Sequence, residues 1–191
     1  MLIKTVFAGF GGQGVLSMGL NLAQAAMMEG KHVTYLPSYG AEVRGGAANC
    51  TVAISTEDIA SPVASSPEFL VVMSQPSLER FQNQVESGGV LFFNSSLVTA
   101  NTPRGDIELL PVPATRLAEE IGNPRAANMI MLGVFIKKTN LVSMDTIFET
   151  LKETFKTKTK LIAANKKALM AGYDFPLPKM PGDAPLRTSQ G

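Results

Sequence analysis

The chain has 191 residues, a length typical of a single domain. Its hydrophobic fraction of 45% allows a sizeable core, while its charged fraction of 17% favours a surface partly covered by another chain. The net charge of +1 gives no electrostatic basis for nucleic-acid binding, and a single cysteine, Cys50, excludes an internal disulfide and a cysteine-held iron–sulfur cluster.

The first feature along the chain is a short apolar run over residues 3–8, which predicts a buried strand. The motif Gly9-Phe10-Gly11-Gly12-Gln13-Gly14 follows it, and the helical pattern over 15–28 comes next, with Gly30 placed to end it. The glycines therefore lie in a tight turn from strand to helix. Because the turn interrupts the apolar run and no run reaches about 18 residues, we expect no signal peptide, no membrane span and a cytoplasmic protein.

Gly9, Gly11 and Gly14 occupy the three positions of the pattern G-x-G-x-x-G, which leaves three interpretations open. A dinucleotide site is one, but the expected second strand over 31–36 ends in Pro37-Ser38, without the carboxylate that binds ribose. Close packing of helix against strand is the second. The third is an anion site, because the free N–H groups and the helix dipole favour negative charge there.

A second glycine-rich stretch, Tyr39-Gly40-Ala41-Glu42-Val43-Arg44-Gly45-Gly46, lies in a long loop predicted over 38–48. Glu42 and Arg44 are two residues apart, so an extended backbone places them on one side. They either form a local ion pair on the surface or present a guanidinium to a carboxylate or phosphate. Since both glycine motifs follow the first two strands, we expect them to share one crevice.

The rest of the chain alternates between strand and helix patterns. Further strands are predicted over 49–55, 69–73, 90–93 and 107–112. Helices are predicted over 76–85 with a cap at Ser74 or Gln75, 115–121 ending at Gly122, 124–138 beginning at Asn123-Pro124, 143–155 capped by Ser143, and 159–171 ending at Gly172. Cys50 reads as a packed small hydrophobe, because no basic residue flanks it.

The sequence divides into a domain over 1–173 and an extended proline-rich tail over 174–191. In the tail, Phe175, Leu177 and Met180 favour docking on a surface. Strand and helix patterns alternate over most of the domain, and its last third has helix patterns only.

The two glycine motifs, in this order, resemble the gamma subunit of the 2-oxoacid:ferredoxin (or other acceptor) oxidoreductases. The helix at Asn123-Pro124, with Asn128 and Leu132-Gly133, is similar to that family as well. The resemblance covers nearly the whole chain and implies one Rossmann-like α/β domain within a larger complex. Such a domain has a single doubly wound, mainly parallel sheet with helices on both faces, followed here by C-terminal helices and the extended tail. It implies no catalytic residue and no metal ligand. The residues that it implies for ligand or partner binding are Gly9, Gly11, Gly12, Gln13, Gly14, Tyr39, Glu42, Arg44, Gly45 and Gly46.

Such a complex decarboxylates a 2-oxoacid and yields an acyl-CoA. The resemblance implies that thiamine diphosphate with Mg is held by alpha and beta subunits, and iron–sulfur clusters by the beta subunit or a ferredoxin-like subunit. The gamma subunit would hold neither, and its role would be structural or on the side of CoA. Ferredoxin or another carrier would accept the electrons.

Two other functions stay open at this point. One is an independent Rossmann-type nucleotide-binding oxidoreductase, and the other is the small subunit of an indolepyruvate oxidoreductase, which shares the glycine motifs. Among the 2-oxoacids, the overall look of the sequence favours 2-oxoglutarate, although substrate contacts are expected mainly in the other subunits.

Overall fold

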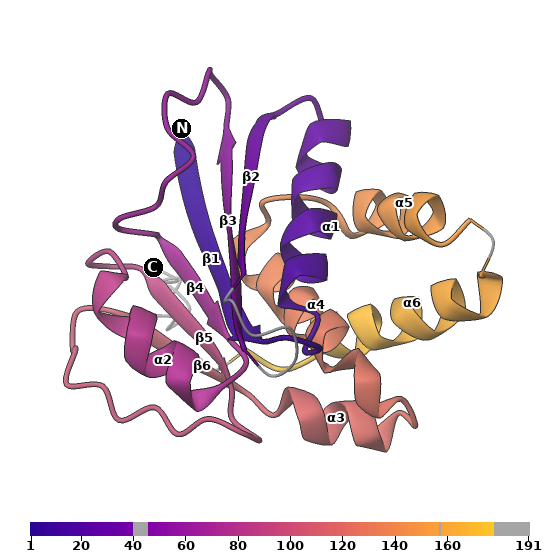
Figure 1. The fold of residues 1–191 in the computed structure, drawn as a ribbon. Coiled ribbons are helices and arrows are strands. Elements are labelled where there is room, and N and C mark those ends of the chain that lie inside the picture. The colour runs from indigo at the N-terminus through magenta and orange to yellow at the C-terminus, as the bar shows by residue number, and fades with distance from the viewer. Residues whose placement is uncertain (40–45, 157, 178–191) are drawn as a thin grey trace, which may run out of the picture.

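Six strands form a sheet in the order β2-β3-β1-β4-β5-β6 in the computed structural model, which describes residues 1–39, 46–156 and 158–177 (Figure 1). The strands are β1 Leu2–Phe10, β2 His32–Tyr39, β3 Ala47–Ser55, β4 Phe69–Val72, β5 Val90–Asn94 and β6 Glu108–Val112. Strands β1, β4, β5 and β6 are parallel neighbours, whereas β3 is antiparallel to both β1 and β2. The predicted α/β fold is confirmed, with one reversed strand that the sequence did not indicate.

Helices cover both faces of this sheet. They are α1 Val15–Met28, α2 Gln75–Phe81, α3 Ala114–Glu120, α4 Ala127–Thr139, α5 Met144–Thr154 and α6 Thr159–Tyr173, with 3₁₀ turns η1 Gln82–Gln84 and η2 Pro124–Ala126. Helix α2 packs through Leu78 on one face, together with Val6 and Leu70 of the sheet. The remaining α-helices of the described chain share the core of the other face, so the two layers are unequal (Figure 1).

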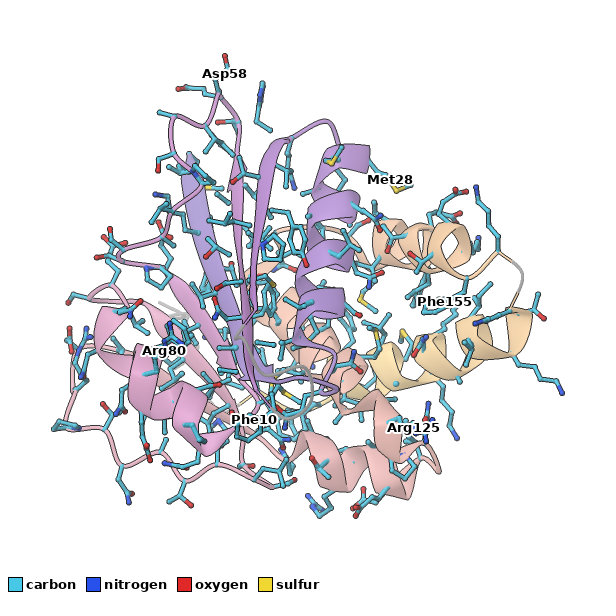
Figure 2. The ribbon with its side chains drawn as sticks, in the orientation of Figure 1. Phe10, Met28, Asp58, Arg80, Arg125 and Phe155 are labelled. Atoms are coloured by element: carbon cyan, nitrogen blue, oxygen red, sulfur yellow. The ribbon has the colours of Figure 1, made fainter. Side chains whose placement is uncertain are left out.

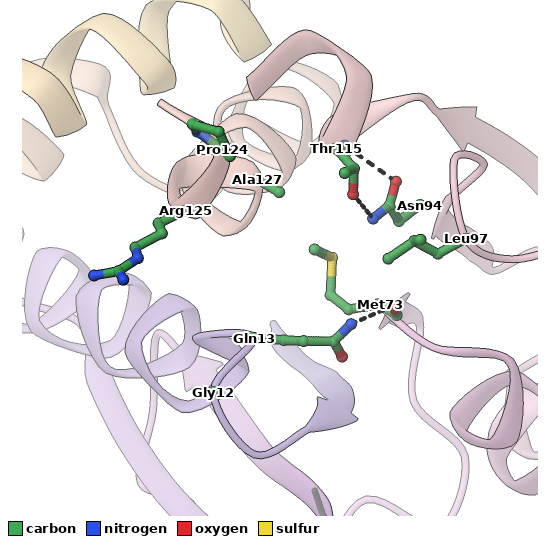
Figure 3. Close-up of a pocket in the computed structure, with 9 residues that line it drawn as sticks. All are labelled: Gly12, Gln13, Met73, Asn94, Leu97, Thr115, Pro124, Arg125 and Ala127. Atoms are coloured by element: carbon green, nitrogen blue, oxygen red, sulfur yellow. Dashed lines mark hydrogen bonds between the residues drawn. The ribbon is translucent and has the colours of Figure 1, made fainter. Parts of the chain in front are cut away.

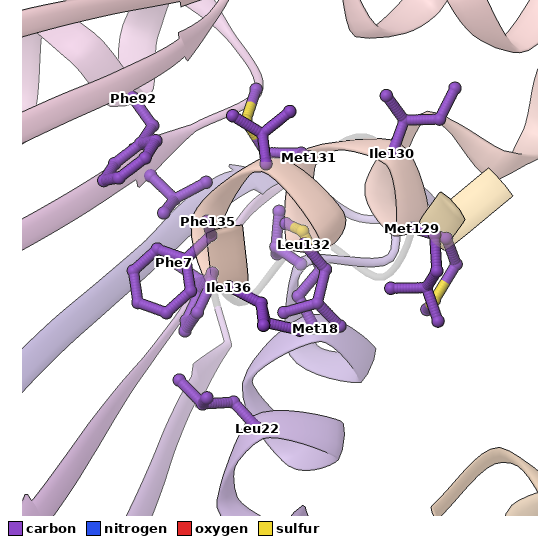
Figure 4. Packing of buried hydrophobic residues seen from close by; sticks show 14 of the residues in the cluster. Phe7, Met18, Leu22, Phe92, Met129, Ile130, Met131, Leu132, Phe135 and Ile136 are labelled. Atoms are coloured by element: carbon purple, nitrogen blue, oxygen red, sulfur yellow. The ribbon is translucent and has the colours of Figure 1, made fainter. Parts of the chain in front are cut away.

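Helix α4 forms the centre of the larger core. Its residues from Met129 to Ile136 are all buried, as expected for a helix that is apolar on most sides. The Phe135 ring lies 5.5 Å from that of Phe7, 5.7 Å from that of Phe69 and 5.3 Å from that of Phe92, measured between centroids. One side chain of α4 thus contacts β1, β4 and β5; Figure 4 shows Phe135 with Phe7 and Phe92. Tilted or edge-to-face contacts of this kind add to the apolar burial.

Several predicted element ends were wrong. The second strand continues to Tyr39, because it pairs along its length with β3, and the predicted loop is correspondingly shorter. Asn123 makes no side-chain cap; Pro124 begins a 3₁₀ turn, and α4 starts only at Ala127. Ser74 is the N-cap residue of α2, as predicted, although its hydroxyl bonds that of Ser77 and no backbone N–H. The Ser143 cap is confirmed, since its hydroxyl accepts the N–H of Thr146.

Gly172 was predicted to end a helix but lies inside α6, which continues to Tyr173. A Cβ at this position would collide with the carbonyl of Ile130 in α4. Gly133 in α4 meets the backbone of Leu169 in the same way. The two glycines therefore permit the close crossing of α4 and α6, which is a packing role that a single sequence does not reveal.

The chain after α6 returns to the core. Phe175 and Leu177 are half-buried against the larger core, and the Lys137 Nζ donates a hydrogen bond to the Phe175 carbonyl at 2.9 Å. These two residues therefore dock, as predicted, on a surface of this chain itself. Met180 lies outside the described residues. Within the described ranges, no helix has the length and apolarity needed to cross a membrane.

Candidate functional site at the carboxyl edge of the sheet

The loops after β1 and β4 diverge at the centre of the sheet. These strands are parallel neighbours, and the helix after β1 packs on one face while the helix after β4 packs on the other. The two loops therefore separate outside the carboxyl ends of the strands. In open α/β sheets this point of divergence forms the crevice in which ligands bind.

The first glycine motif forms the turn between β1 and α1. At Gly9, a Cβ would lie 2.6 Å from the Gln13 Oε1, and at Gly14 it would collide with the Asn128 amide. These two glycines therefore make room for protein side chains, as the packing interpretation requires. Gly12 is different, since its φ is +95° and nothing lies within 4 Å of a Cβ there. It is the open position of the turn.

Gln13 ties the two diverging loops together. Its Oε1 accepts the N–H of Phe10 at 2.7 Å, and its Nε2 donates to the Met73 carbonyl at 2.9 Å. The same amide thus closes the turn after β1 and holds the end of β4. A glutamine serves here because the two bonds need one acceptor and one donor on the same side chain.

The two glycine motifs meet at one edge of the sheet, as expected. The Gly11 N–H donates a hydrogen bond to the Gly46 carbonyl at 2.9 Å, next to the Phe10–Ala47 pair of β1 and β3. Tyr39 is the last residue of β2. Glu42, Arg44 and Gly45 lie outside the described residues, so their predicted ion pair or anion contact stays a prediction.

A cleft of about 370 Å³ opens at the same edge (Figure 3). Its lining comes from the carboxyl ends of the parallel strands and the segments that follow them, from α3, from η2 and from the start of α4: Gly12, Gln13, Met73, Asn94, Leu97, Thr115, Pro124, Arg125 and Ala127. Arg125 is exposed, and it has no hydrogen-bond or ion-pair partner within the described part of the chain. The cleft thus has one cation available to a ligand.

Asn94 fixes the opposite wall of the cleft. Its fully buried amide donates to the Thr115 hydroxyl at 2.8 Å and accepts the N–H groups of Ser96 and Thr115. It therefore joins the loop after β5 to the start of α3, as Gln13 joins the loops after β1 and β4. Figure 3 shows Asn94 and Thr115 on one side of Met73, and Arg125 on the other.

The lining of the cleft contains amide, hydroxyl, guanidinium and apolar groups, which can bind and orient a polar or anionic molecule. The reactive residue types lie elsewhere. Cys50 is fully buried behind α1, and burial raises the pKa of its thiol to about 12, which keeps it protonated and unreactive. His32, at the start of β2, pairs with Asp58 at 3.1 Å. Among the described residues, no three His, Cys, Asp or Glu side chains are placed to hold a metal ion.

The sequence interpretation missed Arg125, Asn94 and Thr115. Asn94 and Thr115 could have been found, because they follow predicted strands at the edge where ligands bind. Arg125 was less accessible to prediction. Its place over the cleft depends on the 3₁₀ turn that precedes α4, and the sequence indicated a regular helix start there.

Comparisons with known proteins identify the family of this chain. Residues 4–175 match the family model described as pyruvate ferredoxin/flavodoxin oxidoreductase. A ketoisovalerate oxidoreductase subunit VorA from Methanothermobacter thermautotrophicus is 42% identical over 95% of this chain, which spans 38% of that protein's length. The 2-oxoglutarate synthase subunit KorC from Methanocaldococcus jannaschii is 35% identical over 87% of this chain and 90% of its own.

A solved structure gives the same result for the fold. The gamma subunit of a keto/oxoacid ferredoxin oxidoreductase from Geobacter sulfurreducens has a TM-score of 0.79 and 26% sequence identity, covering 91% of this chain and 95% of its own. The resemblance noted from the two glycine motifs is confirmed: the chain belongs to the pyruvate ferredoxin/flavodoxin oxidoreductase family, and its relatives include gamma subunits of 2-oxoacid:ferredoxin oxidoreductases.

Proposed function

We propose that this chain is a non-catalytic subunit of a 2-oxoacid:ferredoxin or other acceptor oxidoreductase complex. The observation that carries the proposal is the cleft at the carboxyl edge, which offers binding groups without a nucleophile or a proton-transfer residue in its lining. The thiamine diphosphate, Mg and iron–sulfur clusters of such a complex then belong to the alpha, beta and ferredoxin-like subunits. A single buried cysteine could not supply the four thiolates of a cluster.

The cleft and the two glycine motifs form the binding edge in this proposal. An anionic group, such as a phosphate of CoA, would meet Arg125 and the open backbone at Gly12. Gly11 of the first glycine motif, and Arg44 and Gly46 of the second, are the other residues expected to contact the ligand. A carboxylate on a partner subunit is the alternative anion. If the chain were instead an independent Rossmann-type enzyme, the ligand at this edge would be its nucleotide.

Arg125 provides the test of this edge. Arg125→Ala in the assembled complex should weaken CoA binding by about 1.5–3 kcal/mol, which is typical of a charged hydrogen bond. Lys167→Ala is the matched control, because it removes a cation that binds the Ile121 carbonyl away from the cleft lining. Equal CoA affinity for the wild type and Arg125→Ala would show that CoA does not bind at this edge.

The substrate of the complex is proposed as a 2-oxoacid, with 2-oxoglutarate favoured by the sequence interpretation. The identity of 42% to a ketoisovalerate subunit makes 2-oxoisovalerate the second candidate. Reconstitution of the complex, followed by kcat/KM measurements with 2-oxoglutarate, 2-oxoisovalerate, pyruvate and indolepyruvate, decides between them. Preference for indolepyruvate would assign the chain to the indolepyruvate branch instead.

A further inference from the structure

The outward face of α1 is unusual because no charged residue occurs anywhere in the helix from Val15 to Met28. Its inner residues pack on the sheet, but Leu20, Met27 and Met28 are 40%, 63% and 53% exposed. A helix on the surface of a soluble protein normally has charged or polar residues on its outer side. The apolar stripe of α1, defined by Leu20, Met27 and Met28, therefore has the composition of a covered surface.

A groove adjoins the apolar stripe between α1 and α5. It has a volume of about 280 Å³ and is lined by Gln24, Met27, Met28, Thr150 and Glu153. Figure 2 shows Met28 at the exposed end of α1, next to α5. Methionine side chains are flexible and polarisable, and they line surfaces that accept apolar side chains of varied shape. A groove of this size can receive one large apolar side chain.

The two walls of the groove are held in place by hydrogen bonds. The Thr150 hydroxyl donates to the Asn21 Oδ1 at 3.1 Å, and the Glu29 carboxylate accepts the Ser143 N–H at 2.7 Å. Both bonds join α1 or its C-terminal end to α5 or its cap. The groove is therefore formed before any partner arrives, which lowers the entropic cost of binding.

The size of the apolar stripe indicates what covers it. A fully exposed Leu or Met has on the order of 100 Å² of apolar surface, so three half-exposed side chains supply about 150 Å². One side of a stable interface between globular proteins requires about 800 Å², so the stripe supplies only one part of a larger interface. Leu20 and Met28 are eight residues apart, so the stripe is about 12 Å long and one helix wide, which matches about two turns of a single amphipathic helix.

The lengths of the relatives point to where that helix comes from. In the VorA relatives this domain occupies 38% of a longer chain, so there it is permanently linked to a larger part. Permanent interfaces are more apolar than transient ones, and the uncharged stripe of α1 fits an interface of the permanent kind. We propose that an amphipathic helix of the larger subunit packs along α1 and inserts an apolar side chain into the groove between α1 and α5.

The inference rests on the proposed function, because it requires a larger subunit. The test uses the complex formed by coexpression with the subunits encoded by the neighbouring genes. Leu20→Lys and Met27→Lys each place a charge on the stripe at an exposed position, so the isolated chains should keep the wild-type circular dichroism spectrum and Tm. Val63→Lys is the matched control, since Val63 is 56% exposed and lies outside α1 and the groove.

We expect the two α1 variants to bind the larger subunit at least about tenfold more weakly than the wild type, because a buried unpaired charge is costly, whereas Val63→Lys binds normally. Equal binding by all variants would overturn the docking surface but leave the proposed function intact. Failure of the wild type to assemble with any larger subunit would overturn both.

The occupant is identified by replacing Met28 with a photoreactive diazirine analogue of methionine in the assembled complex. Mass spectrometry of the crosslinked peptide should locate it in a helical segment of the larger subunit. A crosslink to a second copy of this chain, or to residues 178–191, would contradict the proposal.

Discussion

Gly14 is the residue at which backbone conformation and packing both exclude a side chain. Its φ is +75°, and a Cβ would displace the Asn128 amide, which donates to the Gly14 carbonyl at 3.4 Å. Gly12 shares the positive φ but has open space around it. Alanine substitutions at these two glycines therefore separate two free-energy costs: that of a left-handed backbone and that of displacing Asn128.

We expect Gly12→Ala to lower the free energy of unfolding by about 1–2 kcal/mol, the cost of a left-handed residue with a Cβ. Gly14→Ala should lower it by about 1–2 kcal/mol more, because Asn128 must move as well. Urea denaturation measures both. In the Asn128→Ala background the extra cost should disappear, as coupled positions require; persistence of the full difference there would contradict the contact.

Glu29 is the residue whose titration should affect stability. Partial burial raises the pKa of its carboxyl, but hydrogen bonds from Lys31, the Ser143 N–H and Thr146 outweigh this effect, so the pKa lies below its usual value of 4.5. A carboxyl with a pKa lower in the folded than in the unfolded chain stabilises the fold above the unfolded pKa. That contribution is lost as the pH falls through the folded pKa.

Glu29→Gln should therefore lower the free energy of unfolding by about 1–2 kcal/mol at pH 7, and the difference should shrink as the pH falls through the folded pKa. Urea denaturation at several pH values provides the measurement. Glu119→Gln is the control, because Glu119 is exposed on α3 and forms no ion pair within the described chain. A pH-independent difference would indicate that the charge of Glu29 contributes nothing.

At the scale of elements, the crossing of α4 and α6 depends on Gly133 and Gly172. Replacing glycine by alanine inside a helix normally stabilises it by about 1 kcal/mol. Here each added Cβ meets backbone atoms of the other helix, which cannot move aside as a side chain can. Gly133→Ala and Gly172→Ala should therefore lower Tm, against the trend of helix propensity. An unchanged or higher Tm for either variant would refute the close crossing.

The apolar runs of the sequence were enough to predict the strands and most helices, because each run is local and has the expected period. The same local view could not predict that β3 runs antiparallel, since pairing depends on residues far apart in the chain. It also misread Gly172, whose role lies in a contact with Ile130. At the site, the glycine turn was predictable, whereas the Gln13–Met73 bond and the position of Arg125 arise only from the assembled fold.

At the scale of the molecule, residues 174–177 can be compared by truncation with the remainder of the C-terminal segment. Phe175 and Leu177 pack on the core, so removal of residues 174–191 should lower Tm. Removal of residues 178–191 alone keeps Phe175 and Leu177, so it should lower Tm less than the longer truncation. By the sequence interpretation, removal of residues 174–191 should also weaken assembly with the other subunits. Thermal denaturation and copurification of both truncations test this division. An equal loss of Tm in the two truncations would show that the core contact of Phe175 and Leu177 contributes no stability.

We propose above that this chain binds and positions but does not catalyse. The most direct measurement is 2-oxoacid-dependent acyl-CoA formation by the purified chain, with CoA, thiamine diphosphate, Mg²⁺ and an electron acceptor supplied, before and after addition of the larger subunits. No turnover is expected from the chain alone, whereas turnover is expected once the complex has formed. Turnover by the isolated chain would contradict this proposal.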